Sequence, residues 1–113
     1  MSVSTHVLDT SRGVPAEGMP IVLEAATPEG GWQRVGATTT NADGRAPDLV
    51  GDDAVDRAGV YRMTFDTGAW FGARGADAFY PLVQVQFEIV DAGEHHHVPL
   101  LLSPYGYSTY RGS

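Results

Sequence analysis

The chain has 113 residues and no cysteine, and its formal net charge at pH 7 is −7. This length suits a single domain over residues 1–113, and the lack of cysteine excludes disulfides and thiolate chemistry. The seven basic residues are spread along the chain and no apolar run approaches the roughly 20 residues of a membrane span, which argues against nucleic acid and membrane partners.

The first half of the chain predicts short strands joined by turns. Glycine and proline are scattered through a chain that is 42% apolar, which favours an all-β fold. We predict strands over residues 4–9, 20–26 and 32–40. A turn should occupy residues 10–15, a hairpin loop residues 28–31 and a tight turn residues 41–45, after which residues 48–50 should pair briefly.

The second half predicts the longer strands and the one helix. Residues 59–67 alternate, with Tyr61, Met63 and Phe65 on one face. Residues 68–75 form the only helical stretch. Residues 79–90 give a strand whose inward and outward positions alternate: Val83, Val85, Phe87 and Ile89 face in, and Gln84, Gln86 and Glu88 face out. Residues 95–102 and 105–110 close the fold. About eight strands and one short helix indicate a two-sheet β-sandwich.

Imidazoles and hydroxyls are the side chains that could carry chemistry. In the run 95–97, alternation places His95 and His97 on one face of a strand and His96 on the other. His6 lies inside the first strand, and residues 105–113 are rich in tyrosine and hydroxyls. Each feature also has a structural explanation, because paired strand histidines are usually solvated and tyrosines often serve sheet packing. Arg45 in a turn is likewise normally a solvated charge.

The residues alone leave several chemistries open. His6, His95 and His97 could bind zinc and leave a fourth position for water, although no HExxH helix or obvious carboxylate partner accompanies them. A Ser-His-Asp triad is less favoured, because no serine lies in a Gly-x-Ser-x-Gly turn. Metal-free acid–base hydrolysis remains, since imidazoles exchange protons near neutral pH and an arginine can bind a developing oxyanion.

Two motifs at opposite ends of the chain resemble the transthyretin family. The run His6-Val7-Leu8-Asp9, followed by residues 13–16, resembles the family's opening signature. Residues 95–113, which end in Tyr110-Arg111-Gly112-Ser113, resemble the closing signature of its enzyme branch. The Asp43-Gly44-Arg45 turn and residues 79–81 also match, so the resemblance covers the whole chain.

This resemblance implies a transthyretin-like sandwich that hydrolyses 5-hydroxyisourate to 2-oxo-4-hydroxy-4-carboxy-5-ureidoimidazoline in urate breakdown, without metal or cofactor. It implies a homotetramer, a dimer of dimers, whose sites draw residues from more than one subunit. The catalytic residues carried over are His6, Arg45, His97 and Tyr110. The substrate-binding residues are His6, Arg45, Tyr110, Arg111, Gly112 and Ser113, and His95 and Ser108 are auxiliary.

The same resemblance separates the enzyme branch from the hormone carriers of the family. The carriers have lysine where this chain has His6, and they lack counterparts of Arg45 and His97. This chain departs from the enzyme motif at His96, where tyrosine is usual, and alternation turns that residue away from the predicted chemistry. A small-molecule carrier, a zinc-dependent hydrolase and an accessory interaction domain stay open as alternatives. The N-terminal residues lack a secretory pattern, so we expect a cytoplasmic protein.

Overall fold

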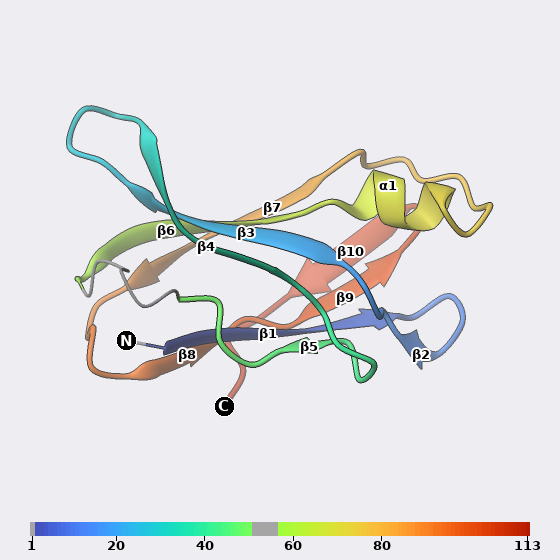
Figure 1. The fold of residues 1–113 in the computed structure, drawn as a ribbon, viewed down its shortest axis with the longest axis horizontal. Helices are drawn as coiled ribbons and strands as arrows, with labels where there is room; N and C mark the ends of the chain where they lie inside the picture. Colours follow the sequence, from blue (N-terminus) through green and yellow to red (C-terminus); the bar gives the residue numbers. More distant parts are fainter. Residues whose placement is uncertain (1, 51–56) are drawn as a thin grey trace.

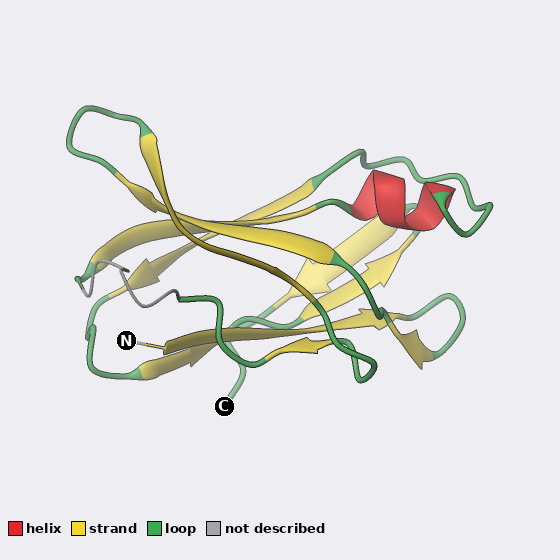
Figure 2. Ribbon diagram, in the orientation of Figure 1, coloured by secondary structure: helices red, strands yellow, loops and turns green. Residues whose placement is uncertain are grey.

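The computed structural model describes residues 2–50 and 57–113, whose strands form two sheets that face one another (Figures 1 and 2). The central strand of the first sheet is β1 (Ser2–Asp9). It pairs antiparallel with β2 (Val14–Pro15) and β5 (Arg45–Ala46), and parallel with β8 (His95–His97) and β9 (Leu100–Ser103). The edge strand β10 (Gly106–Thr109) follows β9.

The second sheet has four antiparallel strands. Their order is β4 (Trp32–Thr39), β3 (Pro20–Ala26), β6 (Gly59–Phe65) and β7 (Val83–Ile89). The helix α1 (Thr67–Gly72) lies at one end of this sheet (Figure 2). These elements confirm the predicted two-sheet sandwich with one short helix.

The core lies between the sheets and follows the predicted alternation. Tyr61, Met63 and Phe65 of β6 are fully buried, as are Val83 and Ile89 of β7. Burying a side chain of this size contributes about 1.5–3 kcal/mol relative to leaving it in water. The hydrophobic effect therefore fixes which face of each strand points inward.

The helix adds an aromatic pair to this core. Trp70 and Phe71 are buried in an edge-to-face contact with 5.2 Å between ring centroids. The indole Nε1 of Trp70 donates a hydrogen bond to the carbonyl of Glu17 at 2.8 Å, which satisfies its polar atom. The predicted helix at 68–75 is thus present, shifted towards the N-terminus.

Proline accounts for two differences from the predicted strands. The strand expected over residues 95–102 is divided into β8 and β9, because Pro99 has no backbone N–H to donate to the ladder. The strand expected over 79–90 begins only at Val83, two residues after Pro81. The segment 59–67 ends as a strand at Phe65, since Thr67 already begins α1.

Residues 48–50, which were expected to pair briefly, make one backbone contact and form no strand. Leu49 donates one backbone hydrogen bond to the carbonyl of Val3 at 2.8 Å, but the strand that pairs there is β5. The turn predicted at residues 10–15 also contains β2 at its end. Both differences arise because two-residue bridges to β1 have too little periodicity to be visible in the sequence.

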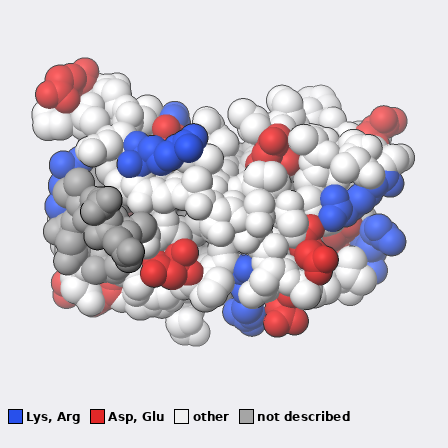
Figure 3. All heavy atoms as spheres, in the orientation of Figure 1, with Lys and Arg blue, Asp and Glu red and all other residues white. Residues whose placement is uncertain are grey.

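The face of the molecule drawn in Figure 3 has no basic patch. Acidic and basic side chains are interspersed over the face drawn in Figure 3. No helix within residues 2–50 and 57–113 is long and apolar enough to cross a bilayer.

Candidate active site

The strand β1 carries the core on one face and polar side chains on the other. Val3 and Val7 are fully buried between the sheets. Because side chains alternate along a strand, Ser2, Ser4 and His6 point to the opposite face. This outer face is the platform on which the candidate site is built.

Neighbouring strands bring three ionisable side chains onto the same face. Arg45 of β5 lies directly opposite His6 in the antiparallel register. In the parallel register with β8, Ser2 aligns with His95 and Ser4 aligns with His97. Strands β1, β5 and β8 lie side by side in Figure 1, so residues far apart in sequence converge there.

The turn before β5 fixes the position of the Arg45 backbone. The Asn41 side-chain oxygen accepts hydrogen bonds from the backbone N–H groups of Asp43 at 3.0 Å and Arg45 at 3.1 Å. Gly44 has φ of 74°, and a Cβ there would lie 2.4 Å from the carbonyl oxygen of Val7. Only glycine fits this position, because it combines left-handed backbone with close contact to β1.

Serine hydroxyls connect the histidine rings. Ser4 Oγ lies 2.7 Å from Nδ1 of His97 and 2.8 Å from Nε2 of His95. Ser2 Oγ lies 2.5 Å from Nδ1 of His95. His6 Nε2 lies 2.9 Å from the Asp43 carbonyl, which can only accept, so this nitrogen carries a proton and leaves Nδ1 as the basic atom of His6.

A cavity of about 270 Å³ opens beside the Ser4 hydroxyl and the His95 and His97 rings. It is lined by Ser4, Thr5, Arg45, Pro47, His95, His97 and Ser113. The ion pairs within residues 2–50 and 57–113 are Arg62–Glu24 and Arg111–Glu94, so no carboxylate of these residues neutralises Arg45. No three histidine, cysteine or acidic side chains in these ranges are placed to hold a metal ion.

Its surroundings lower the pKa of His97 below the ordinary value of 6.5. Burial is the largest cause, followed by the positive charge of Arg45 and by repulsion from His95 and His6. A backbone hydrogen bond with Ser4 acts in the opposite direction. The His97 imidazole is therefore neutral at physiological pH and can accept a proton.

The C-terminal segment also packs against the His97 ring, through Gly112. Gly112 pairs with His97 in an antiparallel bridge, and its N–H donates to the His97 carbonyl at 2.8 Å. A Cβ on Gly112 would lie 2.5 Å from Cδ2 of the His97 ring. The glycine thus lets the chain pass against the imidazole and brings Ser113 to the cavity.

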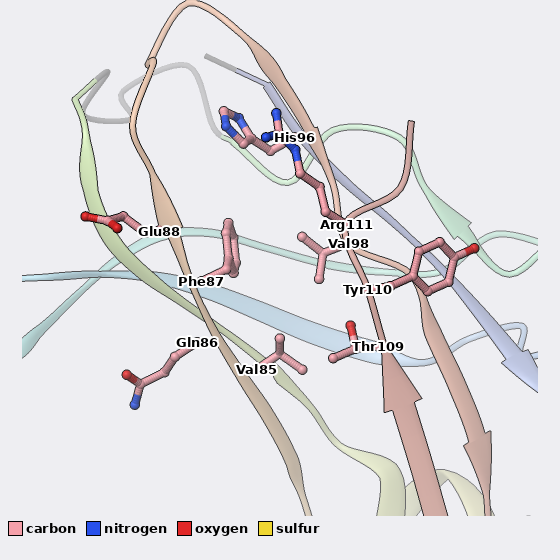
Figure 4. A pocket seen from close by; sticks show the side chains of 9 residues that line it. All are labelled: Val85, Gln86, Phe87, Glu88, His96, Val98, Thr109, Tyr110 and Arg111. Carbon is pink, nitrogen blue, oxygen red and sulfur yellow. The ribbon is translucent and has the colours of Figure 1, made fainter.

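The remaining predicted site residues lie elsewhere in this chain. A second cavity of about 250 Å³ separates β7 from the C-terminal segment, and Figure 4 shows its lining. Tyr110 and Arg111 belong to this cavity, and the Tyr110 ring points away from Val85 and Phe87. Ser108 is exposed on β10. A single chain therefore brings together His6, Arg45, His95, His97 and Ser113, but not Tyr110, Arg111 or Ser108.

His96 points to the opposite face of β8 from His95 and His97, as the alternation predicted, and it lines the second cavity. Its side chain is 5% exposed, and Nδ1 donates to the Glu94 carbonyl at 3.1 Å. The glutamate side chain pairs with Arg111 at 3.0 Å. The departure from tyrosine thus lies on the far side of β8 from His95 and His97.

Sequence reasoning missed Ser2 and Ser4 as partners of His95 and His97. The alternation of β1 already placed Ser4 on the face of His6, but only the parallel register with β8 brings it between two imidazoles. A pairing between the first strand and one that lies some 90 residues later is a tertiary event that spacing does not reveal.

Comparisons with known proteins agree on one family. The profile of the HIUase/Transthyretin family matches residues 3–112. The 5-hydroxyisourate hydrolase of Pseudomonas aeruginosa is 47% identical over 98% of this chain and 90% of its own length. The structure of Klebsiella pneumoniae 5-hydroxyisourate hydrolase is 38% identical with a TM-score of 0.86, covering 99% of this chain and 98% of the other. Sea bream transthyretin in complex with thyroxine is 31% identical with a TM-score of 0.91, covering 99% and 95%.

Proposed function

The chain belongs to the HIUase/transthyretin family, and on that basis we propose that it hydrolyses 5-hydroxyisourate to 2-oxo-4-hydroxy-4-carboxy-5-ureidoimidazoline in urate breakdown. The observation that carries this proposal is the placement of Arg45 and His97 on one cavity, with His6 opposite Arg45 in the strand register and near enough for its charge to act on His97. A neutral imidazole beside a guanidinium that pairs with no carboxylate of the described residues suits water attack on a carbonyl.

The reaction adds one water across a ring N–C(=O) bond. The water oxygen attacks the carbonyl carbon while Nε2 of His97 takes a proton from it. The guanidinium of Arg45 holds the oxygen that becomes negative, an interaction that strengthens as charge develops. The C–N bond then breaks, and the leaving nitrogen receives the proton that Nε2 of His97 took from the water. His6 orients the substrate through Nδ1, because its Nε2 proton is already donated to Asp43.

Protein groups suffice for these steps, so the proposed mechanism needs no metal. Both ring nitrogens of His95 have hydroxyl partners, and one nitrogen of His6 and one of His97 are also engaged. A histidine binds zinc through a free lone pair, so a zinc site at these residues would have to displace several of these hydrogen bonds.

We assign Tyr110 and Arg111 to a site completed by a second subunit of a homotetramer. Tyr110 is 57% exposed although its hydroxyphenyl ring is largely apolar, and Tyr105 and Tyr107 on the same segment are exposed as well. The edge strands β7 and β10 also end their sheets without a further partner among the described residues. Exposed aromatic side chains beside open edges favour self-association. Sedimentation velocity should give a tetramer, and a monomer at micromolar concentration would contradict this assignment.

The decisive assay follows the ultraviolet absorbance of 5-hydroxyisourate generated in place by urate oxidase. The protein should accelerate its decay, and a chelator should leave the acceleration unchanged. No acceleration by the folded protein would refute the proposal, whereas loss of activity with chelator would favour the zinc mechanism. Because the chain also resembles a transthyretin bound to thyroxine, saturable thyroxine binding without hydrolysis would instead indicate a carrier. The cytoplasmic location stays a prediction that cell fractionation can test.

A further inference from the structure

One hydroxyl group lies between two imidazoles at the edge of the proposed site. Ser4 is 6% exposed, and its Oγ is within 2.8 Å of a ring nitrogen of both His95 and His97. The parallel register of β1 and β8 holds all three side chains on one face. Ser2 Oγ extends this series of hydrogen bonds, because it contacts the other ring nitrogen of His95.

Counting protons shows that the two rings are coupled. A serine hydroxyl has one proton, so Ser4 can donate to only one imidazole and must accept from the other. When His97 carries its proton on Nδ1 and donates to Ser4, Ser4 donates to a bare Nε2 of His95. In that state Nε2 of His97 keeps its lone pair, and this nitrogen has no hydrogen-bond partner among the described residues.

Burial and nearby charge determine which of the two imidazoles, His97 or His95, holds a positive charge at lower cost. His97 is partly buried, whereas His95 is exposed. Among the described residues, the groups whose charge acts on His97 are Arg45 from β5, His95 from β8 and His6 from β1. A second positive charge is therefore costly on His97, beside the guanidinium, and less costly on the solvated His95.

We propose that Ser4 and His95 form a proton relay for His97, an inference that rests on the proposed hydrolase function. When Nε2 of His97 takes the proton of the attacking water, its Nδ1–H bond breaks and that proton passes to Ser4 Oγ. The original Ser4 proton passes to Nε2 of His95, which becomes the imidazolium. As His97 gives its Nε2 proton to the leaving nitrogen, both transfers reverse. Ser4 and His95 end unchanged, so no net proton is stored.

Three variants test the relay. Ser4→Ala removes the bridge, Ser4→Thr keeps a hydroxyl, and His95→Gln keeps a hydrogen-bonding side chain that cannot hold the proton. A hydrogen bond to a charged group has a net strength that corresponds to about a ten- to hundredfold effect, so kcat should fall by that factor in Ser4→Ala and in His95→Gln, with a much smaller change in KM. Ser4→Thr should restore most of the loss. Thr38→Ala is the matched control, because it removes an exposed hydroxyl from the other sheet.

The double variant separates a relay from two independent contacts. Residues that act as one unit are not additive, so Ser4→Ala with His95→Gln should be no slower than the slower single variant. The solvent deuterium isotope effect on kcat should also shrink in both single variants, which a merely structural role would not produce. Wild-type kcat in His95→Gln, or multiplied losses in the double variant, would overturn the proposal.

A readout without substrate keeps this test distinct from that of the hydrolase function. Long-range ¹⁵N–¹H spectra report which ring nitrogen of His97 carries the proton. Ser4→Ala should change the tautomer distribution of His97, and an unchanged distribution would overturn the relay. A wild-type protein that does not accelerate substrate decay would refute the hydrolase function itself, whatever these spectra show.

Discussion

Replacing Gly112 by alanine isolates the contact that holds the His97 ring. The added Cβ would lie 2.5 Å from Cδ2 and 3.3 Å from Cγ of His97, and 3.2 Å from Cγ of Pro99. Ordinary contacts of a Cβ begin at 3.4 Å, so the ring or the C-terminal segment must move by about 0.9 Å. A displacement of about 1 Å at a reacting group can cost about a hundredfold in rate, or about 2.7 kcal/mol of transition-state stabilisation.

The expected result for Gly112→Ala is therefore a kcat about a hundredfold lower in a protein that remains folded. The residue lies in an exposed segment and its φ is outside the left-handed region, so Tm should stay within about 4 °C of the wild type. The assay is 5-hydroxyisourate decay, with Tm from circular dichroism. Gly72→Ala is the matched control, since a Cβ there meets nothing within 4 Å. Wild-type kcat in Gly112→Ala, or an equal loss in Gly72→Ala, would refute the packing argument.

Further predictions concern the electrostatics of the site and the turn beside it. The acid limb of the kcat/KM profile should have an apparent pKa below 6.5. Protonation of His97 removes the base, and burial together with the charge of Arg45 lowers the pKa of His97. A limb centred above 6.5 would contradict this. Arg45→Gln should lower kcat by about 10²–10³-fold and move the acid limb to higher pH, since it removes a positive charge that disfavours the imidazolium; a pH–rate profile at fixed ionic strength tests both. Gly44→Ala should lower the free energy of unfolding by about 1–3 kcal/mol through backbone strain and the clash with Val7, measured by urea denaturation, and an unchanged midpoint would contradict it.

The fold was predictable from sequence where a pattern repeats over many residues. The alternation through β6 and β7 places Tyr61, Met63 and Val83 correctly in the core, because two-residue periodicity with one buried face leaves a single register. Strand ends were less accurate where a proline interrupts a run, as at Pro99. The two-residue strands β2 and β5 were not predicted, because their formation depends on the position of β1 and not on local composition.

The motifs named side chains that the fold brings together, but not the hydrogen bonds between them. The motifs identify His6, Arg45 and His97, and alternation correctly separates His96 from its neighbours. The hydrogen bonds of Ser4 depend on the register between β1 and β8, which local patterns do not contain. The role proposed for Tyr110 is different in kind, because it requires a second chain and so cannot be judged from one chain alone.

The two faces of β1 can be altered separately, so a loss of rate can be distinguished from a loss of stability. Val3 and Val7 stabilise the sandwich from the inner face, while Ser4 and His6 carry polar contacts on the outer face. Truncating a buried aliphatic side chain costs about 2–5 kcal/mol, whereas substitutions outside the core usually stay within about 0.5 kcal/mol. Most variants of the outer face should therefore remain folded, so that a loss of rate reports chemistry. Because Ser4 is itself buried, its alanine variant needs the threonine rescue before its loss of rate can be attributed to the relay.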